Sequence, residues 1–175
     1  APAVIGRRID ALEERLGVKL ISGDLLSRPN GEAKLRELVG RLPNAYAVLG
    51  NHDYAVTKDP FSRPVVLDEL GSARLLADEA ETVDVRGRRV QIVGLGPRSY
   101  RRGTARPERL ADASADLRIL LCHFPQVIDR LEPGVFDLVL SGHLHAGQIT
   151  VPYPGGRLRL AHLRWTYVQG VYERP

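Results

Sequence analysis

The sequence predicts an α/β fold within a single domain, and three observations support this prediction. Apolar runs of strand length alternate with segments of helical periodicity in the first part of the chain. Four of the apolar runs end in side chains of the kind that bind metal ions. The length of 175 residues and the hydrophobic fraction of 43% suit one domain with a sizeable core. Alternating strands and helices imply right-handed crossovers and therefore parallel strands.

The first half of the chain begins with a predicted helix. Its apolar residues recur at helical spacing before Gly17, which acts as a stop signal: Ile5, Ile9, Leu12 and Leu16. A strand over residues 18–22 and a loop over residues 27–31 are expected next. A second amphipathic helix over residues 35–42 then precedes a strand over residues 45–49.

The second half is predicted to contain mostly short strands. Residues 54–71 are expected to form a loop with a short helix near residues 65–70. Gly87 marks the turn of a hairpin between two strands. The other expected elements are strands over residues 74–76, 81–86, 89–93, 117–121 and 137–140, a helix over 107–113, a helical turn over 127–131, and β structure over 148–151 that continues beyond a turn at 152–156.

The chain is modestly basic, with 25 Lys and Arg against 21 Asp and Glu. A small excess spread over the chain is typical of a solvated surface and does not favour nucleic-acid binding. The densest cluster, residues 98–102, contains three arginines, and its Gly and Pro neighbours predict a loop exposed to solvent. Because arginine suits bidentate phosphate contacts, contact with substrate phosphate or with an anionic membrane surface is the alternative.

Cys122 is the only cysteine, so the chain has no internal disulfide framework. It lies within a predicted strand beside His123, which predicts a buried thiol rather than a reactive one. No apolar stretch approaches the roughly 20 residues that span a bilayer. We therefore expect a location in the cytoplasm or peripherally at a membrane.

Candidate ligands follow the predicted strands at their carboxyl ends. Asp24 follows the first run after a glycine that permits a sharp turn, and His123 follows a later run. Because the carboxyl ends of parallel strands meet at one edge of an open sheet, such residues are expected to converge. A lone Gly-Asp is more typical of a turn or a helix cap, so Asp24 gains weight only from its companions.

The sequence Gly50-Asn51-His52-Asp53 is more specific. Asn51 offers a neutral carbonyl oxygen as a hard metal ligand. The imidazole of His52 is suited to protonating a leaving oxygen or stabilising phosphoryl charge, and Asp53 is suited to orienting that imidazole. These roles predict a catalytic loop at the end of the strand.

His143 and His145 are two residues apart at the end of another run. In an extended segment both imidazoles would face one way, while Leu144 would face the opposite side and pack. Nitrogen and oxygen ligands without thiolates suit Mn, Zn, Fe or Co rather than a structural zinc site of the cysteine type. His162 has no such setting and is expected to be structural or exposed.

Together these residues resemble the calcineurin-like metallophosphoesterases, whose motifs are D-x-H, G-D, G-N-H-[DE], H and G-H-x-H. The last four motifs are present here in order. Residues 141–152 and 167–172 are similar to a bacterial branch of membrane-associated phosphodiesterases and lipid-related pyrophosphohydrolases. That branch commonly has G-H-T-H-G-G-Q, where this chain has Leu144 and Ala146. The resemblance implies a metallophosphoesterase-type α/β sandwich of mixed sheets, flanked by helices, over residues 1–175.

The resemblance further implies a site for two divalent ions, namely Mn, Zn, Fe or Co. The ligands implied by the motif match are Asp24 as the bridge, Asn51, His123 and His143 at one ion, and His145 at the other. His52, paired with Asp53, would be the acid or phosphate-stabilising residue. The implied reaction is hydrolysis of phosphodiester or pyrophosphate bonds through attack of a metal-bridging hydroxide.

The D-x-H motif does not occur before Asp24. The upstream acidic residues lie in the first predicted helix: Asp10, Glu13 and Glu14. Closing strands of the family after Gly170 are also missing. We therefore expect the chain to be the central part of a longer protein, incomplete at both ends, with one ion's ligands present and only Asp24 and His145 for the other.

Two alternatives to a general phosphoesterase stay open. A non-catalytic scaffold on the same fold is favoured by the incomplete second metal site and opposed by the retained His52. A nuclease-like phosphodiesterase is suggested by the arginines, although nucleic acid is not the partner that we expect. The expected substrate is a phosphate-ester small molecule or a lipid-linked phosphate, with peripheral membrane association of the parent protein.

Overall fold

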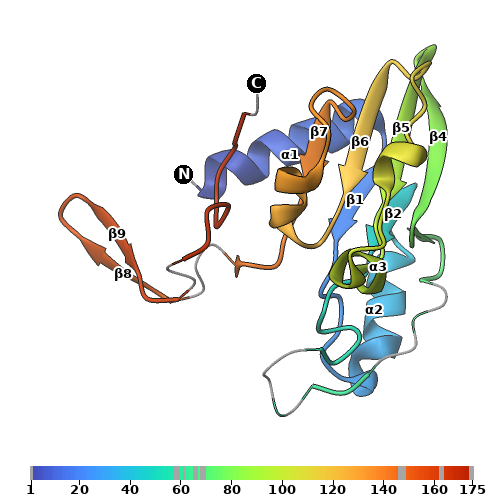
Figure 1. The fold of residues 1–175 in the computed structure, drawn as a ribbon. Coiled ribbons are helices and arrows are strands. Elements are labelled where there is room, and N and C mark those ends of the chain that lie inside the picture. The colour runs from blue at the N-terminus through green and yellow to red at the C-terminus, as the bar shows by residue number, and fades with distance from the viewer. Residues whose placement is uncertain are drawn as a thin grey trace.

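The computed structural model describes residues 2–56, 60, 62–64, 67, 70–145, 149–161 and 164–173. Two sheets form its centre (Figure 1). The first is parallel, with the order β1 (Lys19–Ser22), β2 (Ala45–Val48) and β3 (Arg74–Leu75). The second has the order β4 (Glu79–Val85), β5 (Arg88–Gly94), β6 (Leu117–Leu121) and β7 (Leu138–Leu140). In it β4 is antiparallel to β5, whereas β5, β6 and β7 are parallel.

The two sheets face each other across a shared core. Their central strands, β2, β5 and β6, have side chains buried on both faces. In β2, Tyr46 and Val48 pack with Ile92 and Ile119 of the other sheet. The alternate residues of β2 pack on the opposite side, towards α2 (Glu32–Val39). Burial on both faces requires continuous apolar runs, which explains why these strands were visible in the sequence. The predicted sandwich of mixed sheets is confirmed.

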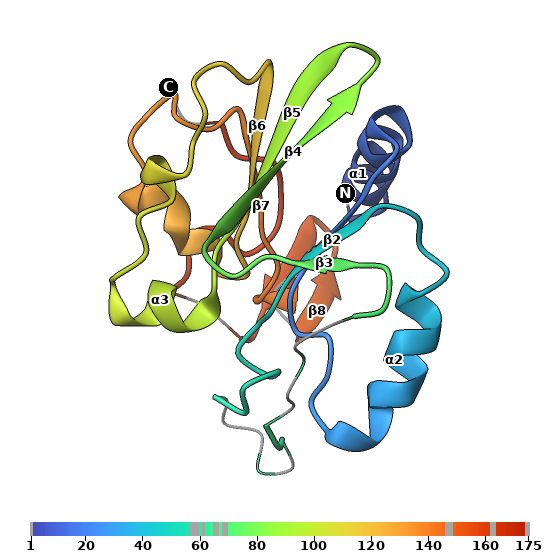
Figure 2. The same cartoon turned by 90° about the vertical axis from the view of Figure 1, so that its right-hand side faces the viewer.

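Helices cover the outer faces of the sandwich (Figure 2). The helices and 3₁₀ turns are α1 (Pro2–Leu16), η1 (Pro29–Gly31), α2 (Glu32–Val39), α3 (Pro97–Arg102), η2 (Pro107–Arg109) and η3 (Pro125–Arg130). As predicted, α1 ends before Gly17, whose φ of 67° is left-handed. No helix in the described part of the chain combines the length and apolarity that crossing a bilayer requires.

Two hairpins match the prediction. The turn between β4 and β5 contains Arg86 and Gly87, with φ of 55° and 76°, as tight hairpin turns require. The second hairpin joins β8 (Thr150–Tyr153) to β9 (Gly156–Arg159) and extends away from the two sheets (Figure 1). Its strands form the β structure that was predicted near the end of the chain.

Two segments differ from the prediction. Residues 98–102 belong to α3 instead of a loop, because Pro97 starts the helix and Gly103 ends it in a left-handed conformation. The helix predicted over residues 107–113 is limited to η2. There Asp112 accepts hydrogen bonds from the backbone N–H and the hydroxyl of Ser114, which compete with helix continuation.

Several expectations fall on parts of the chain outside the described residues. Most of the helix predicted near residues 65–70 does, and so do Gln148 and His162. Within that segment, the described Leu70 is buried and forms a β-bridge with Ala73. The candidate ligands were expected to converge at one edge of a single sheet, and this prediction was wrong. Strands β1 and β2 belong to one sheet, and β6 and β7 belong to the other. The candidate ligands therefore meet where the carboxyl ends of two sheets come together.

Candidate metal centre

Close backbone packing brings the first two motifs together after β1 and β2. Asp24 has a left-handed φ of 56°, directly after Gly23 with φ of 94°. A Cβ on Gly23 would lie 2.7 Å from Nδ1 of His123 and 2.8 Å from the backbone nitrogen of Gly50. A Cβ on Gly50 would in turn contact Oδ1 of Asp24 and lie 2.8 Å from its Cγ. Both glycines are required because any side chain would occupy the position of a candidate ligand.

Three candidate ligands converge on Nε2 of the fourth, His123. This nitrogen lies 3.1 Å from Oδ1 of Asn51, 3.1 Å from Nδ1 of His143 and 3.2 Å from Oδ2 of Asp24. The Asn51 amide is oriented by its nitrogen, which donates a hydrogen bond of 3.1 Å to the carbonyl of Val56. Its oxygen therefore faces the other ligands.

The backbone selects the tautomer of His123. Nδ1 lies 2.7 Å from the carbonyl oxygen of Ser22, which can only accept a hydrogen bond. The ring proton of the neutral imidazole is therefore on Nδ1, and Nε2 presents a lone pair to Asn51 and Asp24. His123 is almost fully buried, with 1% of its surface exposed, so water does not satisfy this lone pair. A backbone carbonyl that orients an imidazole in this way is typical of metal-binding histidines.

The arrangement fits a divalent cation. Ligand atoms of Asp24, His123 and His143 all lie within 4.8 Å of one another. Oδ2 of Asp24 is buried without a hydrogen-bond partner among the described residues, and such an orphaned carboxylate oxygen carries an energetic cost. Lone pairs of Asp24, Asn51 and His123 thus point into one space with no proton between them, and a cation would satisfy all three. The structure brings together the four predicted ligands of one ion.

The charge state of Asp24 is consistent with this use. Burial opposes ionisation of its carboxyl, but the neighbouring His123 imidazole and the backbone N–H of His52 outweigh it. That N–H donates to Oδ1 of Asp24 at 3.0 Å. The pKa of Asp24 consequently lies below its ordinary value, so the carboxylate is charged at neutral pH.

The turn that carries His143 and His145 differs from the extended segment that was expected. Both histidines have left-handed φ angles, of 68° and 44°, which are unusual for non-glycine residues. Leu144 between them is fully buried, as predicted. His145 is more exposed, and its Nε2 lies 3.8 Å from Oδ2 of Asp24. Both imidazoles therefore lie beside Asp24, but a buried leucine and a tight turn place them there.

His52 has a partner that the sequence did not suggest. Its Nδ1 lies 3.2 Å from Oγ of Ser27, in the loop after β1. Ser27 was predicted only as the start of a loop, since a single serine between strands carries no recognisable pattern. It is the residue of the site that sequence reasoning missed.

Asp53 was predicted to orient the imidazole of His52. In the structure its carboxylate accepts hydrogen bonds from the backbone of both loops. Its Oδ1 accepts a hydrogen bond of 2.7 Å from the N–H of Leu26, and its Oδ2 accepts one of 2.7 Å from the N–H of Gly50. The side chain is fully buried. Burial raises the pKa of Asp53 above its ordinary value despite the backbone hydrogen bonds. The geometry thus makes Asp53 a residue that positions the ligand loops.

A groove of about 900 Å³ opens beside these ligands. Asp24, His123, His143 and His145 line it. Apolar side chains of α1 and β7 and residues 167–173 form its other walls. The site is therefore accessible to a ligand with both polar and apolar parts.

Comparison with known proteins identifies the family. The family model of the calcineurin-like phosphoesterases matches residues 3–147, which include every candidate ligand. The chain belongs to the calcineurin-like phosphoesterase family. Within the family, the chain is similar to the uncharacterized metallophosphoesterase YkoQ of Bacillus subtilis, at 28% identity over 91% of this chain and 62% of that protein. It is also similar to the phosphodiesterase YaeI of Escherichia coli, at 30% identity over 63% of this chain and 40% of that protein. The chain spans less than two thirds of the length of these relatives.

Proposed function

We propose that this protein is a metal-dependent phosphoesterase that hydrolyses phosphodiester or pyrophosphate bonds. The observation that carries the proposal is the convergence of Asp24, Asn51 and His143 on Nε2 of His123, beside an Asp24 Oδ2 that has no hydrogen-bond partner among the described residues. Membership of the family supports the reaction class. The relative named as a phosphodiesterase supports the choice of diesters.

The ligand set divides between two ions. Asp24, Asn51, His123 and His143 would hold one divalent ion, and Asp24 with His145 would contribute to a second. Mn, Zn, Fe or Co suit these nitrogen and oxygen ligands. When bound, such ions activate water as a nucleophile at neutral pH and stabilise the charge of the phosphoryl oxygens.

Three further residues of the site would transfer a proton or hold the loops in place: His52, Ser27 and Asp53. We assign to His52 the role of general acid: it donates a proton to the leaving oxygen as the bond between that oxygen and phosphorus breaks. Ser27 holds the ring of His52 through Nδ1. Asp53 keeps the loop of Asn51 and His52 against the loop after β1 through its two backbone hydrogen bonds.

The groove supports a substrate in which a phosphate ester is joined to a partly apolar group. Ile9 and Leu12 of α1 and Phe136 near β7 line it together with the ligands. A phosphate-ester small molecule or a lipid-linked phosphate fits this combination. Peripheral association of the whole protein with a membrane follows if the substrate is lipid-linked.

The test uses the whole protein from which this chain comes, supplied with Mn. We expect hydrolysis of bis(p-nitrophenyl) phosphate that requires the metal and is abolished by Asp24→Asn. The matched control is Asp84→Asn, because Asp84 is an exposed residue of β4 and accepts a hydrogen bond from the backbone N–H of Gly87 in the β4–β5 turn. Absence of hydrolysis of aryl phosphodiesters and of pyrophosphates by the metal-loaded protein would refute the proposal.

Metal analysis separates the enzyme from a non-catalytic scaffold. The purified whole protein is expected to retain divalent metal at the Asp24 site and to lose it in the Asp24→Asn variant. A scaffold would contain none. A nuclease-like function would instead show tight DNA binding with a steep dependence on salt concentration, which we do not expect.

A further inference from the structure

A second cavity lies on the outer side of the four-stranded sheet, between the α3–η2 segment and η3. It has a volume of about 560 Å³, within the range of small-molecule sites. Its walls include the buried side chains of Leu95, Val127 and Leu131. No described residue lines both this cavity and the groove of the metal centre. We call it the arginine cavity, because four arginines line it: Arg101, Arg102, Arg106 and Arg130.

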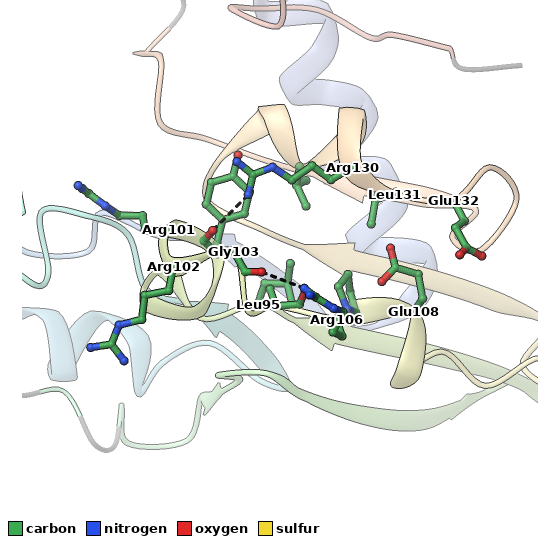
Figure 3. A pocket seen from close by; sticks show the side chains of 13 residues that line it. Leu95, Arg101, Arg102, Gly103, Arg106, Glu108, Arg130, Leu131 and Glu132 are labelled. Carbon is green, nitrogen blue, oxygen red and sulfur yellow. Dashed lines mark hydrogen bonds between the residues drawn. The ribbon is translucent and has the colours of Figure 1, made fainter.

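Some arginines of the described surface have a carboxylate partner, and the four of the cavity do not. Arginines such as Arg88, Arg89 and Arg118 each form an ion pair with an aspartate. Within the described part of the chain, no carboxylate pairs with any of the four arginines of the cavity. In Figure 3 the side chains of Arg101 and Arg102 extend away from the hollow, whereas those of Arg106 and Arg130 lie beside it, so the positive charge at the hollow comes mainly from Arg106 and Arg130.

Two of the guanidinium groups are held in place by the backbone. Nη1 of Arg106 donates hydrogen bonds to the carbonyls of Gly103 and Ala105, at 2.9 and 2.6 Å (Figure 3). Nη1 of Arg130 donates to the carbonyl of Tyr100 at 3.2 Å, and its guanidinium lies over the Tyr100 ring at 4.6 Å. Each guanidinium has five N–H donors, so both have further donors for a ligand. Because both side chains are already held in place, they lose little conformational entropy when a ligand binds.

The cavity is electrostatically asymmetric. Arg101 and Arg102 lie at one end, Arg106 lies between, and Glu108 and Glu132 lie at the other end (Figure 3). Neither glutamate forms an ion pair with another described residue. The arginine end therefore favours an anion, whereas the glutamate end repels a second anion and favours a cation or hydrogen-bond donor.

We propose that the arginine cavity binds a phosphate ester that also carries an ammonium group, with phosphate at the arginines and ammonium at the glutamates. Guanidinium and phosphate match in a bidentate geometry, which directs the phosphate to Arg106 and Arg130. Such a ligand comes either from a free molecule of the phosphoethanolamine type or from a phospholipid headgroup, and the two share this chemistry.

The cavity is next to the metal centre without being part of it. Val127 and Arg130 of η3 line the cavity, while Pro125 and Ile128 of the same turn line the metal groove. The binding proposal does not depend on the proposed phosphoesterase activity. Metal-free protein tests it, so its failure is distinguishable from failure of the proposed function.

The first experiment measures binding of O-phosphoethanolamine to the metal-free whole protein by isothermal titration calorimetry. We expect binding that Arg106→Gln or Arg130→Gln weakens about tenfold or more, as expected from loss of one charge-assisted hydrogen bond. The matched control is Arg109→Gln, because Arg109 is an exposed arginine of η2, three residues after Arg106, that does not line the cavity. Circular dichroism verifies that each variant is folded.

The second experiment tests the asymmetry. The double variant Glu108→Gln and Glu132→Gln is expected to bind O-phosphoethanolamine more weakly and inorganic pyrophosphate more tightly than the unmodified protein. Absence of binding at millimolar concentration, or binding that Arg106→Gln and Arg130→Gln leave unchanged, would overturn the proposal. An unchanged preference in the double glutamate variant would overturn the assignment of the ammonium end.

A third experiment distinguishes the two sources. The protein is sedimented with phosphatidylcholine vesicles that contain or lack phosphatidylethanolamine. Co-sedimentation that depends on phosphatidylethanolamine and on Arg106 identifies a lipid headgroup as the ligand. Binding of soluble O-phosphoethanolamine without such co-sedimentation identifies a free molecule.

Discussion

The backbone N–H of Gly50 donates a hydrogen bond of 2.7 Å to Oδ2 of Asp53. The other oxygen of Asp53 accepts from Leu26, which is 27 residues earlier in the chain. One buried carboxylate thus fastens the loop of Asn51 and His52 to the loop that follows Asp24. The predictions below test how such contacts hold the metal ligands in place.

Asp53→Asn is expected to destabilise the fold and weaken metal binding. The amide nitrogen of asparagine would face a backbone N–H, which leaves a buried donor unsatisfied at a cost of about 1–3 kcal/mol. Loss of support behind the ligands should lower metal affinity about tenfold or more. Chemical denaturation and metal titration measure the two effects. Asp84→Asn makes the same change at an exposed position of β4, and an equal effect there would contradict this explanation.

Gly50→Ala is expected to prevent metal binding and to lower the stability of the fold. The added Cβ would clash with the backbone nitrogen of Asp24 and lie 2.8 Å from its Cγ, so both the carboxylate and the backbone of the loop would shift. Titration with Mn, monitored by calorimetry, measures the loss. Gly155→Ala is the control, because a Cβ there meets only the ring of Tyr153, in the β8–β9 turn. Normal metal affinity in Gly50→Ala would show that Asp24 is not a ligand.

Leu144→Ala is expected to loosen both histidines of the last motif. Leu144 is fully buried, so its truncation should cost about 2–5 kcal/mol of unfolding free energy. The cavity would also remove the packing that keeps His143 and His145 in their left-handed conformations, and metal affinity should fall. Leu70→Ala removes an equally buried leucine from the cluster beside α2. It should destabilise the protein similarly but leave metal affinity unchanged.

Cys122 is expected to resist thiol reagents in the folded protein. It is 1% exposed, and burial raises the pKa of its thiol to about 12. Reaction with Ellman's reagent at pH 8 should therefore require unfolding, and one thiol should react in denaturant. Rapid reaction in native buffer would contradict the packing of β6.

Asp137→Asn is expected to reduce stability slightly, in a manner that depends on pH. Nε and Nη2 of Arg118 each lie 3.2 Å from an Asp137 oxygen, and this contact lowers the pKa of Asp137. The pair is partly exposed, so we expect a loss of about 0.2–1 kcal/mol at pH 7. Because the pKa is lower in the folded chain, the contribution is present above the ordinary value of 3.8 and disappears as pH falls through the folded value. Urea denaturation from pH 7 to pH 3 tests this; a difference that grows as pH falls would contradict it.

Much of the fold and of the ligand set was predictable from the sequence. The central strands of both sheets are continuous apolar runs because they are buried on both faces, and Asp24, Asn51, His123 and His143 follow directly at their ends. Such patterns are local in the chain. The segment that became α3 shows the limit, because its neighbouring Gly and Pro residues suggested a loop, whereas Pro97 and Gly103 are the boundaries of a short helix.

Other features depended on the tertiary structure. The contact of Ser27 with His52 and the hydrogen bond between Asp53 and Leu26 each join residues separated by 25 positions or more. The arginines of the cavity likewise come from different turns of the chain. The sequence by itself determined which residue types follow which strands, since that is a property of neighbours in the chain. Only the packing of two sheets decided which of those side chains meet and which lone pair faces Asp24, because these contacts form when distant loops are buried together.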